Sequence, residues 1–179
     1  MKRKRFVPQK EVINVYCEGK TEVNLFIFLK SIYSNKRVKF HCVKDMGGCD
    51  SLIACKEEHR KFIRGLALKP KKQYKNVKML YILDNDLAES LQIKEYLTGE
   101  GCSVQLCDPN TEGMIMSIIK MPVKKEVGDD DYRAKCKNAF KDHFECEAHE
   151  LKEAKLKEIF NVVGIVQIHL PVLYALFIK

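Results

Sequence analysis

Three acidic residues stand directly after predicted strands, where their type and position together could do chemistry. Glu18 follows the apolar run of residues 11–17, and Asp84 and Asp86 follow the apolar run of residues 77–83. Three carboxylates brought together repel one another unless a cation neutralises them. Ligand sets made only of oxygen suit Mg²⁺ or Mn²⁺ better than Zn²⁺, and such ions polarise phosphates and activate water. The pattern therefore predicts a magnesium or manganese site.

A fourth carboxylate, Glu112, follows a further strand-like run, residues 102–107, with Asp108 beside it. Any one of these acids could instead cap a helix or interact with the positive end of a helix dipole. That explanation accounts for a single acid, such as Asp86, more readily than for three acids that all follow strands. The metal site is therefore the interpretation that covers the whole pattern.

The elements that must position these carboxylates alternate along the chain. The expected strands cover residues 11–17, 37–43, 77–83 and 102–107. The expected helices cover residues 21–33, 51–66, 87–97 and 111–119, with Thr21 as the N-cap of the first. This alternation predicts an α/β fold with a mainly parallel four-stranded sheet and helices on both faces. Ligands of such sheets bind beyond the carboxyl ends of the strands, where the first and third strands would bring the acids together.

The organisation of the chain is expected to be a basic arm, a core and an extension. The arm covers residues 1–10, the catalytic core residues 11–121, and the extension residues 122–179. Within the extension, residues 132–160 read as a charged helical stretch in one or two pieces. The apolar run 162–178 contains polar residues and falls short of the roughly 20 apolar residues of a bilayer span. We expect it to be buried core and not a membrane anchor.

The charge is unevenly distributed. The net charge is +8, but residues 1–80 carry 20 Lys/Arg against 7 Asp/Glu, whereas residues 81–179 carry 12 against 17. A basic half beside an acidic half fits a surface for a polyanion such as nucleic acid next to a carboxylate cluster. A solvated basic surface without a partner is the alternative, and it applies equally to the run Lys2–Arg5.

The eight cysteines form no CxxC pair, and no signal peptide is apparent. Several, such as Cys17 and Cys107, lie in or beside strand-like runs, where thiols behave as small apolar groups. These features predict a reduced, cytoplasmic protein.

Two segments carry a family resemblance. Residues 15–22 (Val-Tyr-Cys-Glu-Gly-Lys-Thr-Glu) resemble the first motif of the Toprim class, a hydrophobic strand that ends in Glu-Gly. Residues 80–86 (Leu-Tyr-Ile-Leu-Asp-Asn-Asp) resemble the second, a strand that ends in Asp-x-Asp. Within the class, the chain is most similar to the RloB-like and abortive-infection Toprim proteins, in which residues 108–113 have a Pro-x-x-Glu counterpart. The resemblance covers residues 11–120.

The resemblance implies a Toprim-like, Rossmann-like domain that binds Mg²⁺ or Mn²⁺. Glu18 would be the acid/base or metal-proximal glutamate, and Asp84 and Asp86 the metal ligands. Glu22 and Glu112 would be supporting ligands.

The same resemblance implies phosphate contacts and a function. Gly19 would let the backbone approach a phosphate closely, and Lys20 would contact phosphate or simply face solvent. The implied activity is hydrolysis of phosphodiesters in RNA, including tRNA, or in DNA. An effector of anti-phage defence, working with a separately encoded ATPase and compatible with a homo-oligomer, fits this family.

Two other functions are compatible with the sequence. A non-catalytic Toprim module could bind nucleic acid or assemble with partners, although extra carboxylates do not help a protein to bind phosphates. A phosphotransferase for small molecules could also use a doubly wound sheet, although the basic first half favours a polyanionic partner.

Three further groups point to weaker hypotheses. The loop of residues 46–51 contains two glycines before a helix but lacks the Lys-Ser/Thr of a P-loop, so a turn is favoured. His59 fits an apolar helix face. Metal-ligating residue types recur in the extension without a zinc spacing, so ordinary helix positions are favoured for Cys136, His143, Cys146 and His149.

Overall fold

The computed structural model describes residues 11–33, 38–45, 77–85, 90–126 and 131–178. Several predictions from the sequence lie outside these residues. They concern the arm at 1–10, the loop at 46–51, the helix at 51–66 with His59, and the candidate ligand Asp86.

The described strands form one parallel sheet. They are β1 (Glu11–Cys17), β2 (Val38–Asp45), β3 (Val77–Asp84) and β4 (Ser103–Cys107), in the spatial order β2-β1-β3-β4. Every neighbouring pair is parallel, and Cys17 at the end of β1 stands opposite Ile82 of β3. The predicted α/β class and parallel sheet are confirmed, and β1 and β3 are direct neighbours.

Alternation along the strands divides the core into two layers. Ile13 and Val15 of β1 belong to one buried cluster, whereas Tyr16 and Tyr81 stack on the opposite face with ring centroids 5.1 Å apart. Both faces are apolar because a parallel sheet is covered on both sides.

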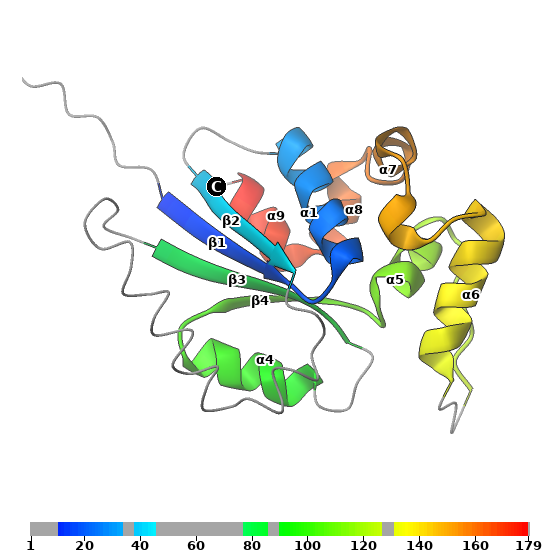
Figure 1. Cartoon of the computed structure of the whole chain (residues 1–179), viewed down its shortest axis with the longest axis horizontal. Helices are drawn as coiled ribbons and strands as arrows, with labels where there is room; N and C mark the ends of the chain where they lie inside the picture. Colours follow the sequence, from blue (N-terminus) through cyan, green and yellow to red (C-terminus); the bar gives the residue numbers. More distant parts are fainter. Residues whose placement is uncertain (1–10, 34–37, 46–76, 86–89, 127–130, 179) are drawn as a thin grey trace, which may run out of the picture.

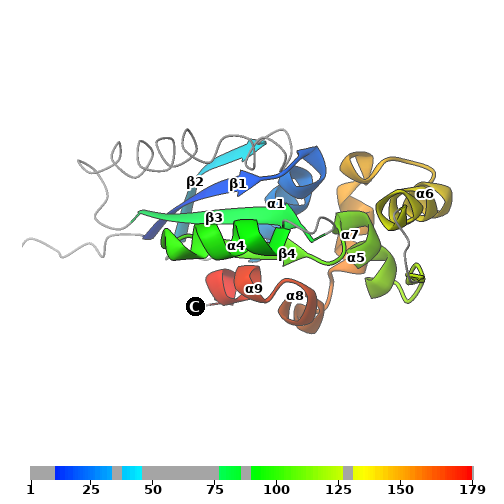
Figure 2. The same cartoon turned by 90° about the horizontal axis from the view of Figure 1, so that it is seen from below.

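Helices cover the two faces (Figures 1 and 2). Helices α1 (Lys20–Tyr33) and α9 (Pro171–Ile178) pack on the face of Ile13, and α4 (Ser90–Gly99) packs on the face of Tyr16.

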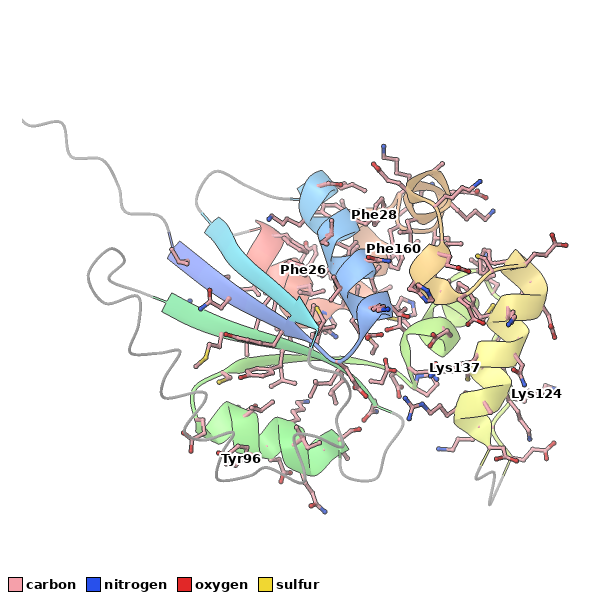
Figure 3. All side chains as sticks on the ribbon, in the orientation of Figure 1. Phe26, Phe28, Tyr96, Lys124, Lys137 and Phe160 are labelled. Carbon is pink, nitrogen blue, oxygen red and sulfur yellow. The ribbon has the colours of Figure 1, made fainter. Side chains whose placement is uncertain are left out.

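Several of the remaining elements gather beyond the carboxyl ends of the strands, as both views show. They are α5 (Thr111–Ile118), α6 (Tyr132–Phe144), a 3-10 turn (Ala148–Glu150) and α7 (Glu153–Ile159). Helix α8 (Val163–His169) lies beside α9 instead. Apolar residues of all these elements join the cluster on the α1 side of the sheet, where Phe28 of α1 lies 6.3 Å from Phe160, measured between ring centroids (Figure 3). The C-terminal helices therefore complete the core.

Several predicted boundaries were wrong by a few residues. Helix α1 begins at Lys20, so Thr21 lies inside its first turn and is not the N-cap. Strand β3 runs on through Asp84, which is its last residue and does not follow it. The helical stretch at 132–160, by contrast, is divided as the two-piece alternative expected, because Glu145, at φ 54°, takes the left-handed conformation that ends α6.

The apolar run at 162–178 forms α8 and α9, which meet at Pro171. Proline suits the first position of a helix because the N–H that it lacks has no partner there. Leu170 and Phe177 are buried as expected, but Val162, Val163 and Ile168 are 54%, 45% and 74% exposed, so the prediction of buried core was wrong for these three residues. Among the described helices, none is long and apolar enough to cross a bilayer.

Candidate functional site

Glu18 and Asp84 meet at the carboxyl edge of the sheet. Glu18 follows β1 directly, and its N–H donates to the carbonyl of Ile82 at 3.0 Å. The side chain turns toward β3, where Glu18 Oε2 accepts the backbone N–H of Asp84 at 2.9 Å. Both carboxylates are buried. The structure therefore brings together two of the three acids that the sequence analysis singled out, while Asp86 lies outside the described residues.

Glu22 joins this pair from the first turn of α1. Its Oε2 accepts the N–H of Gly19 at 2.8 Å, which is the side-chain half of a capping box, and its Oε1 accepts the hydroxyl of Thr111 at 2.7 Å. Glu22 is only 4% exposed. Glu22 therefore stabilises the start of α1, in addition to being one of the buried carboxylates near Glu18.

The N-terminus of α5 faces Asp84. Asn110 caps this helix, since its Oδ1 accepts the N–H of Gly113 at 2.8 Å. The N–H of Thr111 donates to Asp84 Oδ1 at 3.0 Å, and Glu112 is the buried second residue of the helix. A helix N-terminus stabilises negative charge, so α5 favours the ionised form of Asp84.

Electrostatics links the buried carboxylate of Glu22 to those of Glu112 and Glu18. Burial raises the pKa of Glu22, the hydrogen bond from Thr111 opposes this shift, and the charges of Glu112 and Glu18 raise the pKa further. A carboxyl group whose pKa is raised by other carboxylates is stabilised by a proton or by a cation.

The donor set fits a divalent metal in chemical type, because carboxylate oxygens from β1, β3 and α5 suit Mg²⁺ or Mn²⁺. Among the described residues, however, no three Asp, Glu, His or Cys side chains stand close enough together to hold an ion as they are. Backbone N–H groups occupy oxygens of Glu18, Glu22 and Asp84 instead.

The two residues predicted to contact phosphate are Gly19 and Lys20, at the start of α1. Lys20 is exposed at the start of α1. Gly19 is partly buried, and a Cβ there would lie 3.3 Å from Glu22 Oε2, so its lack of a side chain also serves the contact with Glu22.

Asn85, directly after β3, connects β3 to the segment that follows β4. Its N–H is shared by the carbonyls of Cys107 and Pro109, and its side chain donates to Asp108 Oδ1 at 3.0 Å.

Sequence reasoning missed Thr111 and Asn110. The signal was an Asn-Thr pair at the start of a helix that follows a strand, a common capping pattern. What the sequence could not reveal is that Thr111 contacts Glu22 and Asp84 from a different segment.

Other candidates lie apart from the carboxylates. Cys136 is buried within α6, and it forms no metal cluster with the neighbouring His and Cys residues in the described chain. Two cavities of about 330 and 530 Å³ share His143, Phe144 and Lys155 in their walls, and no candidate carboxylate lines either one.

Comparison of the chain with protein-family models, with curated proteins and with solved structures gave no match.

Proposed function

We propose that this chain is a metal-dependent phosphodiesterase of the Toprim class that acts on nucleic acid. The observation that carries the proposal is the meeting of Glu18 and Asp84, from adjacent parallel strands, in a buried acidic cluster at the carboxyl edge of the sheet. Ligands and catalytic groups of parallel α/β sheets gather at this edge.

Glu18, Asp84 and Asp86 would hold Mg²⁺ or Mn²⁺, with Glu22 and Glu112 in support. When bound, such an ion supplies Lewis acidity toward a phosphate oxygen and lowers the pKa of water. The protein's own part is to fix Glu18. The N–H of Asp84 holds Glu18 Oε2, so that the carboxylate is oriented to accept or return a proton.

Nucleic acid is the proposed substrate because the chain is basic, with a net charge of +8. RNA, including tRNA, and DNA both present the phosphodiester that this chemistry requires. A role as an effector in anti-phage defence, with a separately encoded ATPase as partner, is part of the proposal and rests on the Toprim resemblance. The proposed cytoplasmic location rests on the cysteine pattern of the sequence.

A second candidate is a non-catalytic binding or assembly module. The hydrogen bonds of Glu22 favour it, because both of its oxygens are engaged at the starts of α1 and α5. In that case the acidic cluster would stabilise the fold, and no metal would be required.

Cleavage of labelled RNA and DNA by the purified chain, with Mg²⁺, Mn²⁺ or a chelator, separates the two candidates. Asp84→Asn preserves an oxygen that can accept the N–H of Thr111, so it should fold but lose metal-dependent cleavage. Asp142→Asn, on the exposed side of α6, is the matched control. Cleavage by Asp84→Asn at the wild-type rate would refute the enzymatic proposal.

A further inference from the structure

Helices α8 and α9 present an outer surface without charged residues, called here the α8–α9 surface. Residues 159–178 contain no Asp, Glu, Lys or Arg, although these residues make up 31% of the chain. Burial explains this only for the inner side of the two helices, at Val166, Leu170, Leu173 and Phe177. The outer side is exposed, at Val163, Gln167, Ile168, Pro171 and Ala175. The lack of charge on the outer side therefore needs a different explanation.

Exposed apolar side chains gather at α8. Among the described residues, seven large apolar side chains are at least 40% exposed, and three of them, Val162, Val163 and Ile168, lie on α8 or directly before it. Ile168 is the most exposed of the seven, at 74%. Leu91 of α4, by comparison, has polar exposed neighbours, which are Gln92, Lys94 and Glu95. Single exposed apolar residues are ordinary, whereas a group of them on one surface marks an interaction site.

The two helices lie where a partner can reach them. They contact each other, and Figure 2 shows them side by side on the outside of the molecule. Burial lowers the pKa of His169, the histidine of α8, so this side chain also adds no charge at neutral pH. The α8–α9 surface is therefore accessible, mainly apolar and uncharged.

We propose that the α8–α9 surface binds the same surface of a second copy of this chain. A partner with a charged contact surface would bury its charges against α8 and α9, which offer no counter-charge, and burying an unpaired charge is costly. The partner surface must therefore be uncharged and apolar. A second copy has such a surface, and a two-fold axis brings the same residues of both copies together, as in the commonest homo-oligomers.

A lipid surface fits these helices less well than a second copy does. Peripheral helices contact lipids through Trp, Phe and Leu, with Lys and Arg on their polar face. The large apolar side chains exposed at α8 are Val and Ile, and residues 159–178 contain no basic residue apart from His169. Attraction to anionic lipids would therefore have no source on the two helices.

Sedimentation velocity over a wide range of protein concentration tests the proposal. We expect the wild type to form dimers, and Ile168→Lys to weaken the dimer about 30-fold or more, as the loss of a central interface contact does. Leu91→Lys, at a residue of α4 that is 56% exposed, is the matched control and should dimerise as wild type does. Raising the NaCl concentration should strengthen the dimer, because salt screens the repulsion between two copies that each carry a net charge of +8.

A wild type that stays monomeric at the highest concentration overturns the proposal, and its sedimentation with phosphatidylglycerol vesicles would then identify the α8–α9 surface as a lipid contact. A dimer that Ile168→Lys leaves intact also overturns it, because a different surface would hold the copies together. Circular dichroism shows whether each variant is folded. Should Ile168→Lys fail to fold, Val163→Lys, at a second exposed position of α8, takes its place, and the same comparison applies.

Discussion

Gly113 shows how little space separates α5 from its neighbours. A Cβ at this residue would lie 2.8 Å from Pro109 Cγ and 2.9 Å from Cys136 Sγ, closer than packed atoms allow. Proline is rigid and Cys136 is held inside the core, so neither atom can move aside easily. Glycine is required here for close packing of α5 on α6, directly behind the acidic cluster.

Gly113→Ala is expected to lower the free energy of unfolding by about 1–3 kcal/mol, the usual cost of overpacking a core. Chemical denaturation monitored by circular dichroism measures this change. Gly164→Ala is the matched control, since the nearest atom to a Cβ there is 3.9 Å away; helix propensity alone should make it neutral or slightly stabilising. Equal stability of Gly113→Ala and wild type would contradict the packing argument.

Glu18→Gln tests the proposed catalytic role. The amide oxygen can still accept the N–H of Asp84, so the fold should persist, and the loss of one clustered charge should leave the melting temperature in metal-free buffer unchanged or raised. Single-turnover cleavage should slow by about 10²–10⁴ if Glu18 moves a proton.

The exposed Glu95→Gln on α4 serves as the control for Glu18→Gln. A Glu18→Gln protein that melts at a lower temperature yet cuts at the wild-type rate would identify Glu18 as a purely structural residue.

At the scale of elements, β4 caps the last helix. Gln105 is buried in β4, and its Oε1 accepts the N–H groups of Val172 and Leu173 at 3.0 and 3.4 Å. These are among the N–H groups that the start of α9 leaves without an intrahelical partner. A side chain of the sheet therefore anchors α9 to the edge strand.

Gln105→Met keeps the approximate shape and removes the acceptor. It should destabilise the fold by about 1–3 kcal/mol, because one buried and one partly buried donor lose their partner, and hydrogen exchange at Val172 and Leu173 should accelerate. Gln92→Met on the exposed face of α4 should change neither quantity. Unchanged exchange at Val172 and Leu173 in Gln105→Met would show that the cap is not needed.

His169, at the end of α8, makes stability depend on pH. Burial lowers the pKa of His169 below the ordinary value of 6.5. The unfolded chain therefore binds a proton more readily, and this contribution to stability is present above pH 6.5 and is lost as the pH falls toward the folded pKa. Melting temperatures of wild type and His169→Gln should differ in their slope just below pH 6.5.

The exposed His149→Gln should retain the wild-type pH slope. If His169→Gln also retains it, the buried environment of His169 has no bearing on stability.

The sequence could predict those elements that are stabilised by the burial of their own apolar residues. The strands β1 and β3 are mainly apolar runs, interrupted by Asn14 and Lys78, whose central residues are buried on both faces, and this composition identifies them without knowledge of their partners. Their neighbouring places at the sheet centre agree with the arrangement that the α/β interpretation expected. The adjacency of Glu18 and Asp84 could therefore be predicted from the sequence.

What the sequence could not predict depends on the packing of distant segments. The bridging of Glu22 and Asp84 by Thr111 is set by where α5 packs, which no local pattern encodes. The exposure of Ile168 has the same origin, because α8 turns this residue outward while Val166 faces the core. Apolar character alone cannot tell which side of a short helix is covered.

At the scale of the whole molecule, two exposed lysines lie beyond the carboxyl ends of the strands. They are Lys124 and Lys137, at the α6 end of the protein (Figure 3). Together with the basic first half of the sequence, these residues could neutralise phosphates of a bound nucleic acid.

The proposed nucleic-acid partner therefore predicts binding that weakens steeply with salt. The double substitution Lys124→Gln/Lys137→Gln should reduce the affinity for a labelled RNA or DNA. It should also lower the slope of log affinity against log salt concentration by about one for each phosphate that is no longer neutralised. Fluorescence anisotropy in the inactive Asp84→Asn background measures binding without cleavage. Lys94→Gln on the exposed side of α4 is the control, and affinity indifferent to salt would exclude a phosphate-binding surface.

The pairing of α1 with α9 has a consequence for the newborn protein. Phe26 and Phe177 stack with ring centroids 6.1 Å apart, although they are far apart in the sequence. Synthesis proceeds from the N-terminus, so the part of the apolar sheet face that α9 covers stays open until α9 leaves the ribosome. Until then the nascent chain exposes this apolar surface to chaperones and to aggregation, and its folding can finish only after α9 has emerged.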